Sequence, residues 1–373
     1  MAVTEGHGYT SRMGGALHDI TVVDLAGNIA TSYCAKMFAD YGAQVVNVEP
    51  TEGFSTRQLA PFTAGGESAM HAYLHTNKKS VSGYSANDLQ DLLDDASLIL
   101  GDAQTPTFDH DAIFTRVTWY GSSGPYAHYV GSDAQCFALN AMLPNIGHVA
   151  GPPLIPTGYQ AQIVAGKNAY VASLTQLLGR KLGNTTSAID IEVSTFESML
   201  CLTEVGVIGA YNTGLTPTRM GINRFPPTYP LGVFPCQDGW LGLTVLTPGQ
   251  WHAFCDLLDM PDFKHVDLFQ TAVGRLEAVD VIEPVIRERL LTRKAEALFY
   301  AGQQARIPLA RVPTMAELFQ VDQFQQRQAF GEARLSDGTT LAVPSVPFRL
   351  FATPPNFGGP VAALGEHTAE FVG

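Results

Sequence analysis

Three consecutive segments near the start of the chain constrain its fold more than any other feature. Residues 20–25 (ITVVDL) are a compact run rich in β-branched residues, residues 30–41 have the apolar spacing of a helix, and residues 45–48 form a second β-branched run. Gly42 follows the helical stretch at the position where a C-terminal cap glycine is expected. This order of strand, helix and strand predicts one unit of an α/β fold.

The same alternation continues further along the chain. Strands are predicted at 98–100 and 114–119, with a helical segment at 87–94. Small and apolar residues at 166–182 predict a buried helix of more than four turns, and residues 188–193 again resemble a strand. We therefore expect a parallel sheet covered by helices, since helical crossovers join parallel strands.

The length of the chain predicts two domains. Its 373 residues exceed the roughly 250–300 residues that a single hydrophobic core supports. The composition shifts to Pro, Arg, Asn and Tyr at 217–235, which is typical of a segment that crosses between domains. We expect a large domain at 1–200, a smaller one at 215–320, and a return to the large domain at 325–373.

The smaller domain is also expected to be α/β. Residues 240–245 predict a strand, and residues 285–300 are strongly helical. Pro284 lies where a first helical position would accept it, because the amide hydrogen that proline lacks has no partner there. After residue 330 the sequence predicts short β segments and proline-rich loop.

Composition and charge exclude several classes of protein. Apolar residues make up 46% of the chain and charged residues 15%, which argues against long disorder, and the formal charge of -13 with no basic block argues against nucleic acid. No window approaches the roughly 18 apolar residues of a membrane helix, and the first 15 residues lack the apolar core of a signal peptide. We therefore expect a cytoplasmic protein without a membrane partner. The five cysteines, none of them spaced as CxxC, predict buried reduced thiols: Cys34, Cys136, Cys201, Cys236 and Cys255.

Six segments spread over nearly the whole chain carry motifs in a fixed order. They are VVDLAGNIATSYCAKMFADYGAQVVNVEP (22–50), TNKKSV (76–81), YGSSGPYAHYVGSD (120–133), GVFPCQDGWLGL (232–243), IPLARVPTMAEL (307–318) and LGEHT (364–368). Together they resemble the signatures of family III CoA-transferases, the CaiB/BaiF family. The first is similar to the opening strand-helix-strand of that family, and the third to its Gly-x-x-Gly-Pro-Tyr loop.

This resemblance implies both a fold and a chemistry. The expected fold is a Rossmann-like large domain with a smaller α/β domain, two chains forming an intimately interlocked dimer. The expected substrates are an acyl-CoA and a carboxylic acid, with coenzyme A as a substrate and no tightly bound cofactor. In this family an aspartate attacks the thioester to give a mixed anhydride, and CoA then passes through an enzyme thioester to a second acid. A carboxylate suits this work because it is a nucleophile that becomes a good leaving group.

The position of that aspartate holds Gln162. The family aspartate lies four residues before a glycine that opens the long helix, and counting back from Gly166 gives Gln162. A neutral amide would not form a useful anhydride, and no acidic residue lies between Asp133 and Asp190 to replace it. Two roles stay open for Gln162: its amide NH2 could orient a thioester carbonyl, or the residue is a structural remnant of a lost site.

Two further departures concern the neighbouring motifs. Racemases of the same superfamily use a histidine in a Gly-His-Asp triplet together with the same carboxylate, but this chain has Gly131, Ser132 and Asp133 there. The family segment Glu-Asn-Phe-Arg-Pro has become residues 101–106 (GDAQTP), without the arginine expected to help hold a CoA phosphate. Neither half of the racemase pair is present, and the phosphate-binding charge must come from elsewhere.

Basic residues at strand and loop ends are the remaining candidates for phosphate binding. Arg57, Lys78 and Lys79 can meet phosphates electrostatically, although adjacent lysines are often simply solvated. The full set of expected CoA-binding residues is Ala26, Gly27, Ile29, Arg57, Lys78, Lys79 and Ser132.

Other polar clusters carry less specific signals. His71 and His75 lie four residues apart and would share a helix face, but without a third ligand or a neighbouring HExxH glutamate we expect no metal site. Residues 109–111 (DHD) fit a turn or a cap. His128 follows the Gly-Pro-Tyr loop and is either a site residue near the CoA mouth or an ordinary surface position.

The sequence thus leaves two hypotheses for function. In the first, the chain is an enzyme that moves CoA between carboxylic acids or does other chemistry on an acyl-CoA, alone as a homodimer. In the second, it is the non-catalytic subunit of a heteromeric CoA-transferase, paired with a paralogue that supplies the aspartate.

Overall fold

The computed structural model describes residues 15–184, 188–214 and 219–372. The chain divides into two compact units, and each is described by itself. The first unit consists of Met1–Met142, Ile155–Gly214 and Asp322–Gly373, and the second of Leu143–Leu154 and Leu215–Val321. The assignment of 1–200 and 325–373 to a CoA-binding domain, and of 215–320 to a smaller one, stays a prediction.

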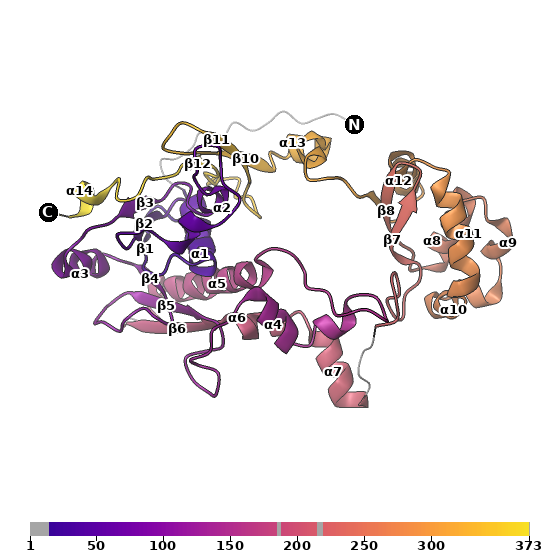
Figure 1. Cartoon of the computed structure of the whole chain (residues 1–373), viewed down its shortest axis with the longest axis horizontal. Helices are drawn as coiled ribbons and strands as arrows, with labels where there is room; N and C mark the ends of the chain where they lie inside the picture. Colours follow the sequence, from indigo (N-terminus) through magenta and orange to yellow (C-terminus); the bar gives the residue numbers. More distant parts are fainter. Residues whose placement is uncertain (1–14, 185–187, 215–218, 373) are drawn as a thin grey trace. The chain divides into compact units, whose positions relative to one another are not determined.

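A six-stranded sheet forms the centre of the first unit (Figure 1). The strands are β1 (Thr21–Asp24), β2 (Gln44–Val48), β3 (Lys79–Val81), β4 (Leu98–Asp102), β5 (Ile113–Thr118) and β6 (Ile189–Ser194). Their order is β3-β2-β1-β4-β5-β6, and every neighbouring pair is parallel. This is the strand order of a Rossmann fold, in which the order reverses between β1 and β4. The prediction of an α/β fold with a parallel sheet is confirmed.

Helices cover both faces of this sheet (Figure 1). Helices α1 (Ile29–Asp40) and α5 (Gln160–Lys181) pack on the face that carries Val22, whereas α3 (Ala86–Asp94) packs on the face that carries Val23. The two valines point to opposite faces because side chains alternate along a strand. The other helices of this unit are α2 (Ala69–Leu74), α4 (Asp133–Leu139), α6 (Thr195–Leu200), α7 (Glu204–Thr213), α13 (Asp322–Gln326), α14 (Thr368–Phe371) and the 3-10 turn η1 (Ser55–Gln58).

A glycine brings the two main helices unusually close. A Cβ atom at Gly166 of α5 would lie 2.5 Å from the carbonyl oxygen of Ala30 in α1, so no other residue fits there without a shift. Helix α5 begins at Gln160, six residues before its predicted start, because its polar first turn is capped from another part of the chain. Gly42 ends α1 with a φ of 102°, as the sequence predicted.

The C-terminal part of the chain returns to the first unit and covers the edge of β3. A small sheet is formed by β10 (Phe330–Arg334), β11 (Thr340–Pro344) and β12 (Gly359–Pro360). Beyond it, the backbone N–H of His367 donates to the carbonyl oxygen of Ser80 at 2.9 Å, and Lys79 forms an ion pair with Glu370. These contacts satisfy polar groups of the edge strand, as an exposed sheet edge requires.

The second unit has an antiparallel sheet and its own core. Strands β7 (Leu231–Cys236), β8 (Gly239–Thr244) and β9 (Leu309–Arg311) pair in that order. Trp251 and Phe254 are fully buried between this sheet and the helices. The helical elements are α8 (Pro248–Leu257), α9 (Pro261–Lys264), α10 (Ala272–Glu277), α11 (Val279–Leu291), α12 (Ala295–Gln304) and the 3-10 turns η2 (Leu143–Asn145), η3 (Asp267–Gln270) and η4 (Glu317–Gln320).

Two predictions from the sequence are wrong in detail. Pro284 does not begin a helix but lies inside α11, and the predicted helix over 285–300 is interrupted after Leu291 before α12 begins at Ala295. Pro284 is the sixth residue of α11 and lacks the N–H that would donate a hydrogen bond within the helix. The buried side chains of Ile282 and Ile286 nevertheless hold the helix against the core. Among the cysteines Cys201 is exposed, whereas the other four are buried free thiols.

None of the helices in the described part of the chain is both long and apolar enough to cross a membrane.

Candidate functional site

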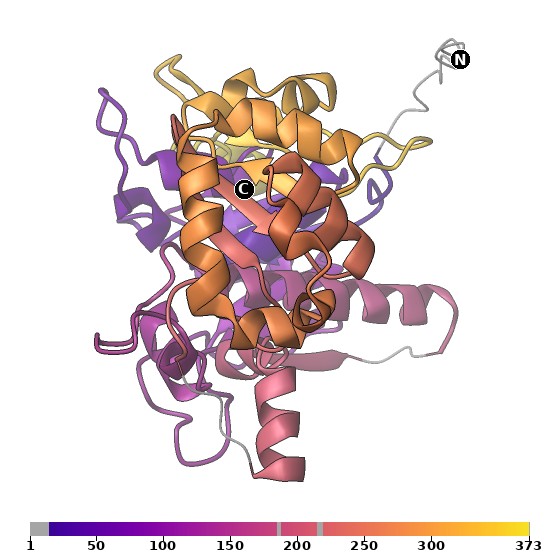
Figure 2. The same ribbon diagram turned by 90° about the vertical axis from the view of Figure 1, so that its right-hand side faces the viewer.

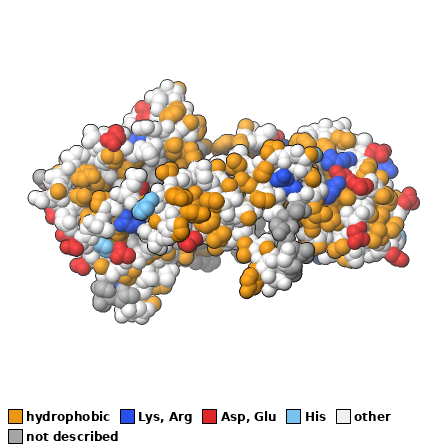
Figure 3. Space-filling view, turned by 60° about the horizontal axis from the view of Figure 1, so that its bottom comes forward, with side chains coloured by type: hydrophobic (Ala, Val, Ile, Leu, Met, Phe, Trp, Pro, Cys, Tyr) orange, Lys and Arg blue, Asp and Glu red, His pale blue; other side chains and the backbone are white. Residues whose placement is uncertain are grey.

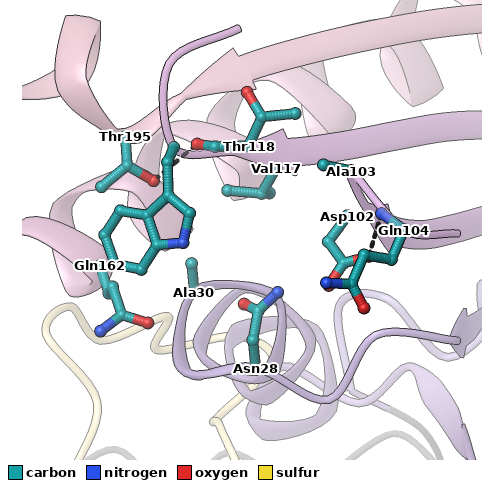
Figure 4. Close-up of a pocket in the computed structure, with 10 residues that line it drawn as sticks. Asn28, Ala30, Asp102, Ala103, Gln104, Val117, Thr118, Gln162 and Thr195 are labelled. Carbon is teal, nitrogen blue, oxygen red and sulfur yellow. Dashed lines mark hydrogen bonds between the residues drawn. The ribbon is translucent and has the colours of Figure 1, made fainter. Parts of the chain in front are cut away.

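A cavity of about 140 Å³ lies at the carboxyl ends of β4 and β5 in the first unit (Figure 4). Ligands of open parallel sheets bind at this edge, where the strand order reverses. The lining residues are Asn28, Ala30, Asp102, Ala103, Gln104, Val117, Thr118, Trp119, Gln162 and Thr195. Gln162 and Asp102 lie at opposite ends of the cavity, with Asn28 and Ala30 between them (Figure 4).

The start of α1 forms the floor of the cavity. The Asp24 carboxylate accepts the backbone N–H groups of Ala26 and Gly27, both at 3.1 Å, which shapes the turn that follows β1. Gly27 has a φ of 58°, and a Cβ atom there would lie 2.0 Å from the ring of Phe54. Asn28 then caps α1, because its Oδ1 accepts the N–H of Thr31 at 3.0 Å. The side-chain nitrogen of Asn28 remains available to the cavity.

Gln162 stands at the start of α5 and is held by Asp133. Its side-chain Nε2 donates to Oδ2 of Asp133 at 2.8 Å. The Oδ1 atom of Asp133 accepts the backbone N–H groups of Ala161 at 2.8 Å and of Gln162 at 3.3 Å. Asp133 is only 8% exposed, and it provides the negative charge that a helix N-terminus favours. It therefore acts as a distant cap for α5.

The opposite end of the cavity is a turn after β4. Oδ1 of Asp102 accepts the backbone N–H groups of Gln104 and Thr105, at 2.9 and 3.1 Å. Arg116 fixes the same turn from outside the cavity, since its Nη1 donates to the carbonyl oxygens of Asp102 and Thr105. This segment is the one expected from the sequence to correspond to the family's Glu-Asn-Phe-Arg-Pro, and here it brings the carboxylate of Asp102 to the cavity.

The wall between the two ends comes from β5 and the start of α6. Thr118 accepts the N–H of Gly121 at 2.9 Å, and Thr195 donates its hydroxyl to the carbonyl oxygen of Thr118 at 2.9 Å. Trp119 rests on Gly131, where a Cβ atom would lie 2.7 Å from the indole. The indole position in the wall therefore depends on a glycine in the neighbouring loop.

Of the predicted phosphate-binding residues, Arg57 pairs with a buried carboxylate. Its Nε and Nη2 donate to the two oxygens of Glu49 at 2.8 and 2.7 Å, and Ser80 donates to the same carboxylate at 2.6 Å. Burial acts to raise the pKa of Glu49, but the hydrogen bonds and charge of Arg57 outweigh it and hold that pKa below its usual value. Arg57 is half-buried, so part of its guanidinium still faces solvent.

The two predicted lysines lie in different environments. Lys78 is 3% exposed and its Nζ donates to the carbonyl oxygen of Ser32 at 2.8 Å. Burial lowers the pKa of Lys78 to about 7, against the opposing charge of Asp24. Lys79 is half-buried, forms the ion pair with Glu370 and lies 5.0 Å from the ring centre of Phe371. Lys79 is thus the more accessible of the two.

The remaining predicted binding residues lie in two places. Ala26, Gly27 and Ile29 belong to the turn and first residues of α1, next to Asn28 of the cavity, although the side chain of Ile29 is in the core. Ser132 precedes α4 and donates its hydroxyl to Gln135. Ser132 is next to Asp133 in the chain, and Asp133 in turn bonds Gln162 at one end of the cavity.

The histidine pair is a buried structural element of this unit. The rings of His71 and His75 stack with their centres 4.1 Å apart, and both accept or donate a hydrogen bond with Thr56. Asn47 bonds the other nitrogen of His75 at 3.0 Å. Burial lowers the pKa of His71 to about 3 and that of His75 well below its usual value, so both rings are neutral. Within the described residues no group of three or more His, Cys, Asp or Glu side chains could hold a metal ion.

The other candidates lie outside the cavity. His128 is exposed in the loop after β5. His110, in the segment before β5, lies 3.7 Å from a carboxylate oxygen of Asp190. Asp190 is the second residue of β6, so it lies at the amino edge of the parallel sheet, opposite to the cavity. None of these three residues lines the cavity.

Comparisons with known proteins show the family to which this chain belongs. The sequence model described as "CoA-transferase family III" matches residues 17–82 and 94–368. The chain belongs to the family III CoA-transferases. Among curated relatives, the succinate–glutarate CoA-transferase of Agrobacterium fabrum is 24% identical over 95% of this chain and 94% of its own length. The succinyl-CoA:mesaconate CoA-transferase of Haloarcula marismortui is 26% identical over 96% of each chain.

The solved structures agree with this family fold. A CaiB/BaiF family protein from Brucella suis superposes with a TM-score of 0.84, at 20% identity, over 96% of this chain and 98% of its own. This likeness concerns the fold alone. The resemblance that the sequence motifs indicated is thereby confirmed, and CoA-transferase activity on acyl-CoA and acid substrates is supported by the family and its relatives.

Sequence reasoning missed most of the residues that line the cavity of this CoA-transferase. Gln162 was named as a site residue, whereas Asn28, Trp119 and Thr195 were not, and Asp102 was considered only as part of segment 101–106. All four lie at or just after the end of a strand, or at the helix start that follows one. Because ligands bind at the carboxyl edge of a parallel sheet, that position was the signal that could have found them.

Proposed function

We propose that this protein acts on acyl-CoA thioesters and carboxylic acids, and that Gln162 occupies the position of the family's nucleophilic aspartate. The observation that carries this proposal is the place of Gln162 in the cavity, with its amide bonded to the buried Asp133. An amide nitrogen or oxygen in this setting has no ionised form that would attack a thioester. The usual anhydride route therefore does not begin at this residue.

Other carboxylates could take over the nucleophilic role, and their positions differ. Asp133 has both oxygens engaged in hydrogen bonds and is buried. Asp190 lies at the far edge of the sheet. Asp102 is the carboxylate among the ten residues that line the cavity. If a covalent route exists, Asp102 is the best-placed group to carry it.

The test is a search for a covalent intermediate. The protein is incubated with acyl-CoA, trapped with hydroxylamine or borohydride, and mapped by mass spectrometry. We expect no acyl or CoA adduct at any carboxylate. An adduct at Asp102 or Asp133 would overturn the lost-nucleophile proposal and make the protein an ordinary transferase with a displaced nucleophile.

A second function is favoured by an exposed apolar helix. In α7 the side chains of Val207, Ile208 and Tyr211 are exposed, Tyr211 by 89%, and Leu202 just before the helix is also exposed. Helix α7 extends away from the layers of its unit in two views (Figures 1 and 2), and hydrophobic side chains form patches on the face drawn in Figure 3. Such a surface is typical of an interface with another chain.

This surface supports an interlocked dimer, either of two copies or with an aspartate-bearing paralogue. In the second case the chain is the non-catalytic subunit of a heteromeric CoA-transferase. Native mass spectrometry of the protein isolated from its source cell distinguishes them. A stoichiometric paralogue supports the subunit function, whereas a pure homodimer that exchanges CoA supports the enzyme, and a monomer contradicts both forms of the dimer.

We also propose that the nucleotide end of CoA binds around the start of α1 and β3. Arg57 and Lys79 are half-buried basic groups there, and the backbone of 26–29 approaches the cavity. Basic groups and helix starts both favour phosphate. The proposed contacts are Ala26, Gly27, Ile29, Arg57, Lys78, Lys79 and Ser132.

A further inference from the structure

The bond to Asp133 decides which end of the Gln162 amide the cavity meets. An ionised carboxylate only accepts hydrogen bonds, so the group that faces Oδ2 of Asp133 at 2.8 Å must be the NH2 of Gln162. The amide oxygen then faces the cavity (Figure 4), and it has no hydrogen-bond partner within the residues that the structure describes. This reverses the role considered from the sequence, in which the NH2 would face a thioester carbonyl.

Asp133 is fixed in a way that keeps this orientation. It is buried, and its other oxygen accepts the first backbone N–H groups of α5, from Ala161 and Gln162. Rotating the carboxylate would leave the buried N–H of Ala161 without a partner, which is costly. Asp133 is therefore a positioning residue that sets the hydrogen-bonding character of Gln162.

The rest of the lining adds a second acceptor and a neutral donor. At the far end, the turn occupies Oδ1 of Asp102 and leaves Oδ2 without a partner among the described residues. Between the ends, Asn28 uses its oxygen to cap α1 and offers its NH2. The ten lining residues comprise one carboxylate, three amides, two hydroxyls, the indole of Trp119 and three aliphatic side chains, and none of these described residues is basic.

We propose that this cavity selects an acyl group that carries a hydroxyl over one that carries a second carboxylate. A hydroxyl can donate to the amide oxygen of Gln162 and accept from the NH2 of Asn28. A carboxylate would set acceptor against acceptor at Gln162 and like charge against Asp102. The inference rests on the proposed function, because it assumes that the acyl end of a CoA thioester enters the cavity.

The experiment is calorimetry on the full chain in its native oligomeric form with four matched thioesters and free CoA. Butyryl-CoA, 2-hydroxybutyryl-CoA and 3-hydroxybutyryl-CoA share a four-carbon chain with succinyl-CoA, so only the added group differs. We expect at least one hydroxyacyl thioester to bind about fivefold to tenfold more tightly than butyryl-CoA, the gain of one buried hydrogen bond. Succinyl-CoA should bind more weakly than butyryl-CoA.

Two variants test the cause of the selectivity. In Asp133→Asn the new amide can keep its oxygen on the N–H groups of α5, so its NH2 faces Gln162 and turns the Gln162 amide round. The preference for hydroxyacyl over succinyl thioesters should then fall by at least fivefold while free CoA binds as before. In Asp102→Asn the affinity for succinyl-CoA should rise, with the ratio of hydroxybutyryl to butyryl affinity unchanged.

Each outcome decides one proposal. Succinyl-CoA binding as tightly as the hydroxyacyl thioesters overturns this inference and leaves the proposed function standing. Failure of CoA and all four thioesters to bind overturns the proposed function and the inference with it. An Asp133→Asn variant that folds but keeps the wild-type selectivity shows that Asp133 does not set the polarity of Gln162.

Discussion

Replacing Gln162 by aspartate tests how Asp133 shapes the site. The change removes the hydrogen bond between Nε2 and Oδ2 of Asp133 and sets a second carboxyl near the first. At a separation of roughly 4 Å and an effective dielectric of about 20, two negative charges repel by about 4 kcal/mol. This equals roughly three pKa units, so the introduced carboxyl should titrate near pH 7 rather than near 4.

The sign of the stability change follows from linkage. The introduced carboxyl has a higher pKa in the folded state than in the unfolded state. Between these two pKa values it is protonated in the folded protein but ionised in the unfolded chain. Gln162→Asp should therefore lose stability relative to the wild type as the pH rises from about 4 to 7. We expect the loss in free energy of unfolding caused by Gln162→Asp, measured with urea, to be about 2–3 kcal/mol larger at pH 8 than at pH 5. Any CoA exchange that the variant gains should rise over the same interval, since only the ionised form attacks.

The matched control is Gln160→Asp, at the exposed start of the same helix, where the side-chain Nε2 donates to the carbonyl oxygen of Thr157. Its effect should be nearly the same at both pH values. The double variant Asp133→Asn plus Gln162→Asp should also lose the pH dependence. If Gln162→Asp alone is destabilised equally at pH 5 and pH 8, the two carboxyls do not interact and the reasoning is refuted.

Three further changes test other parts of the structure. Gly166→Ala should destabilise the protein by about 1–3 kcal/mol, because its Cβ would lie 2.5 Å from the carbonyl oxygen of Ala30. The control Gly179→Ala, in the same helix, has room for a Cβ and should stabilise the protein slightly. Thermal unfolding of both variants measures this, and equal effects on stability would contradict the close contact at Gly166. His71→Gln should make the free energy of unfolding less sensitive to acid. The pKa of His71 is lowered to about 3 in the folded protein, so the wild type loses stability as the pH falls from about 6.5. Urea unfolding at pH 7.5 and pH 5 measures this, and an unchanged pH dependence would count against a buried neutral ring. Lys79→Ala should weaken CoA binding about threefold to fivefold at low salt, since one ionic contact with phosphate is lost. The control Lys181→Ala breaks an exposed ion pair with Asp19 and should leave the affinity for CoA unchanged. Calorimetry that finds equal CoA affinities for both variants would remove Lys79 from the proposed site.

Local patterns in the sequence predicted helices and strands well where the spacing of apolar residues alone decides the structure. The β-branched run at 20–25 and the helical spacing at 30–41 correspond to β1 and α1, and Gly42 ends the helix with a positive φ. Prediction was less good where packing outweighs local preference. Pro284 lies inside α11 because buried neighbours hold the helix, and α5 starts early because Asp133 caps it from 28 residues away.

The sequence by itself determined the α/β fold and the family, because these depend on the order of residues along the chain, and it predicted that Gln162 stands at the position of the family aspartate. Only the tertiary structure decided what Gln162 offers to a ligand. Its amide is turned by Asp133, and the other end of its cavity is closed by Asp102, which lies at the end of β4 and far from Gln162 in the sequence. A hydrogen bond between distant residues has a direction in space that the order of residues does not contain, and that direction sets the chemistry of the site.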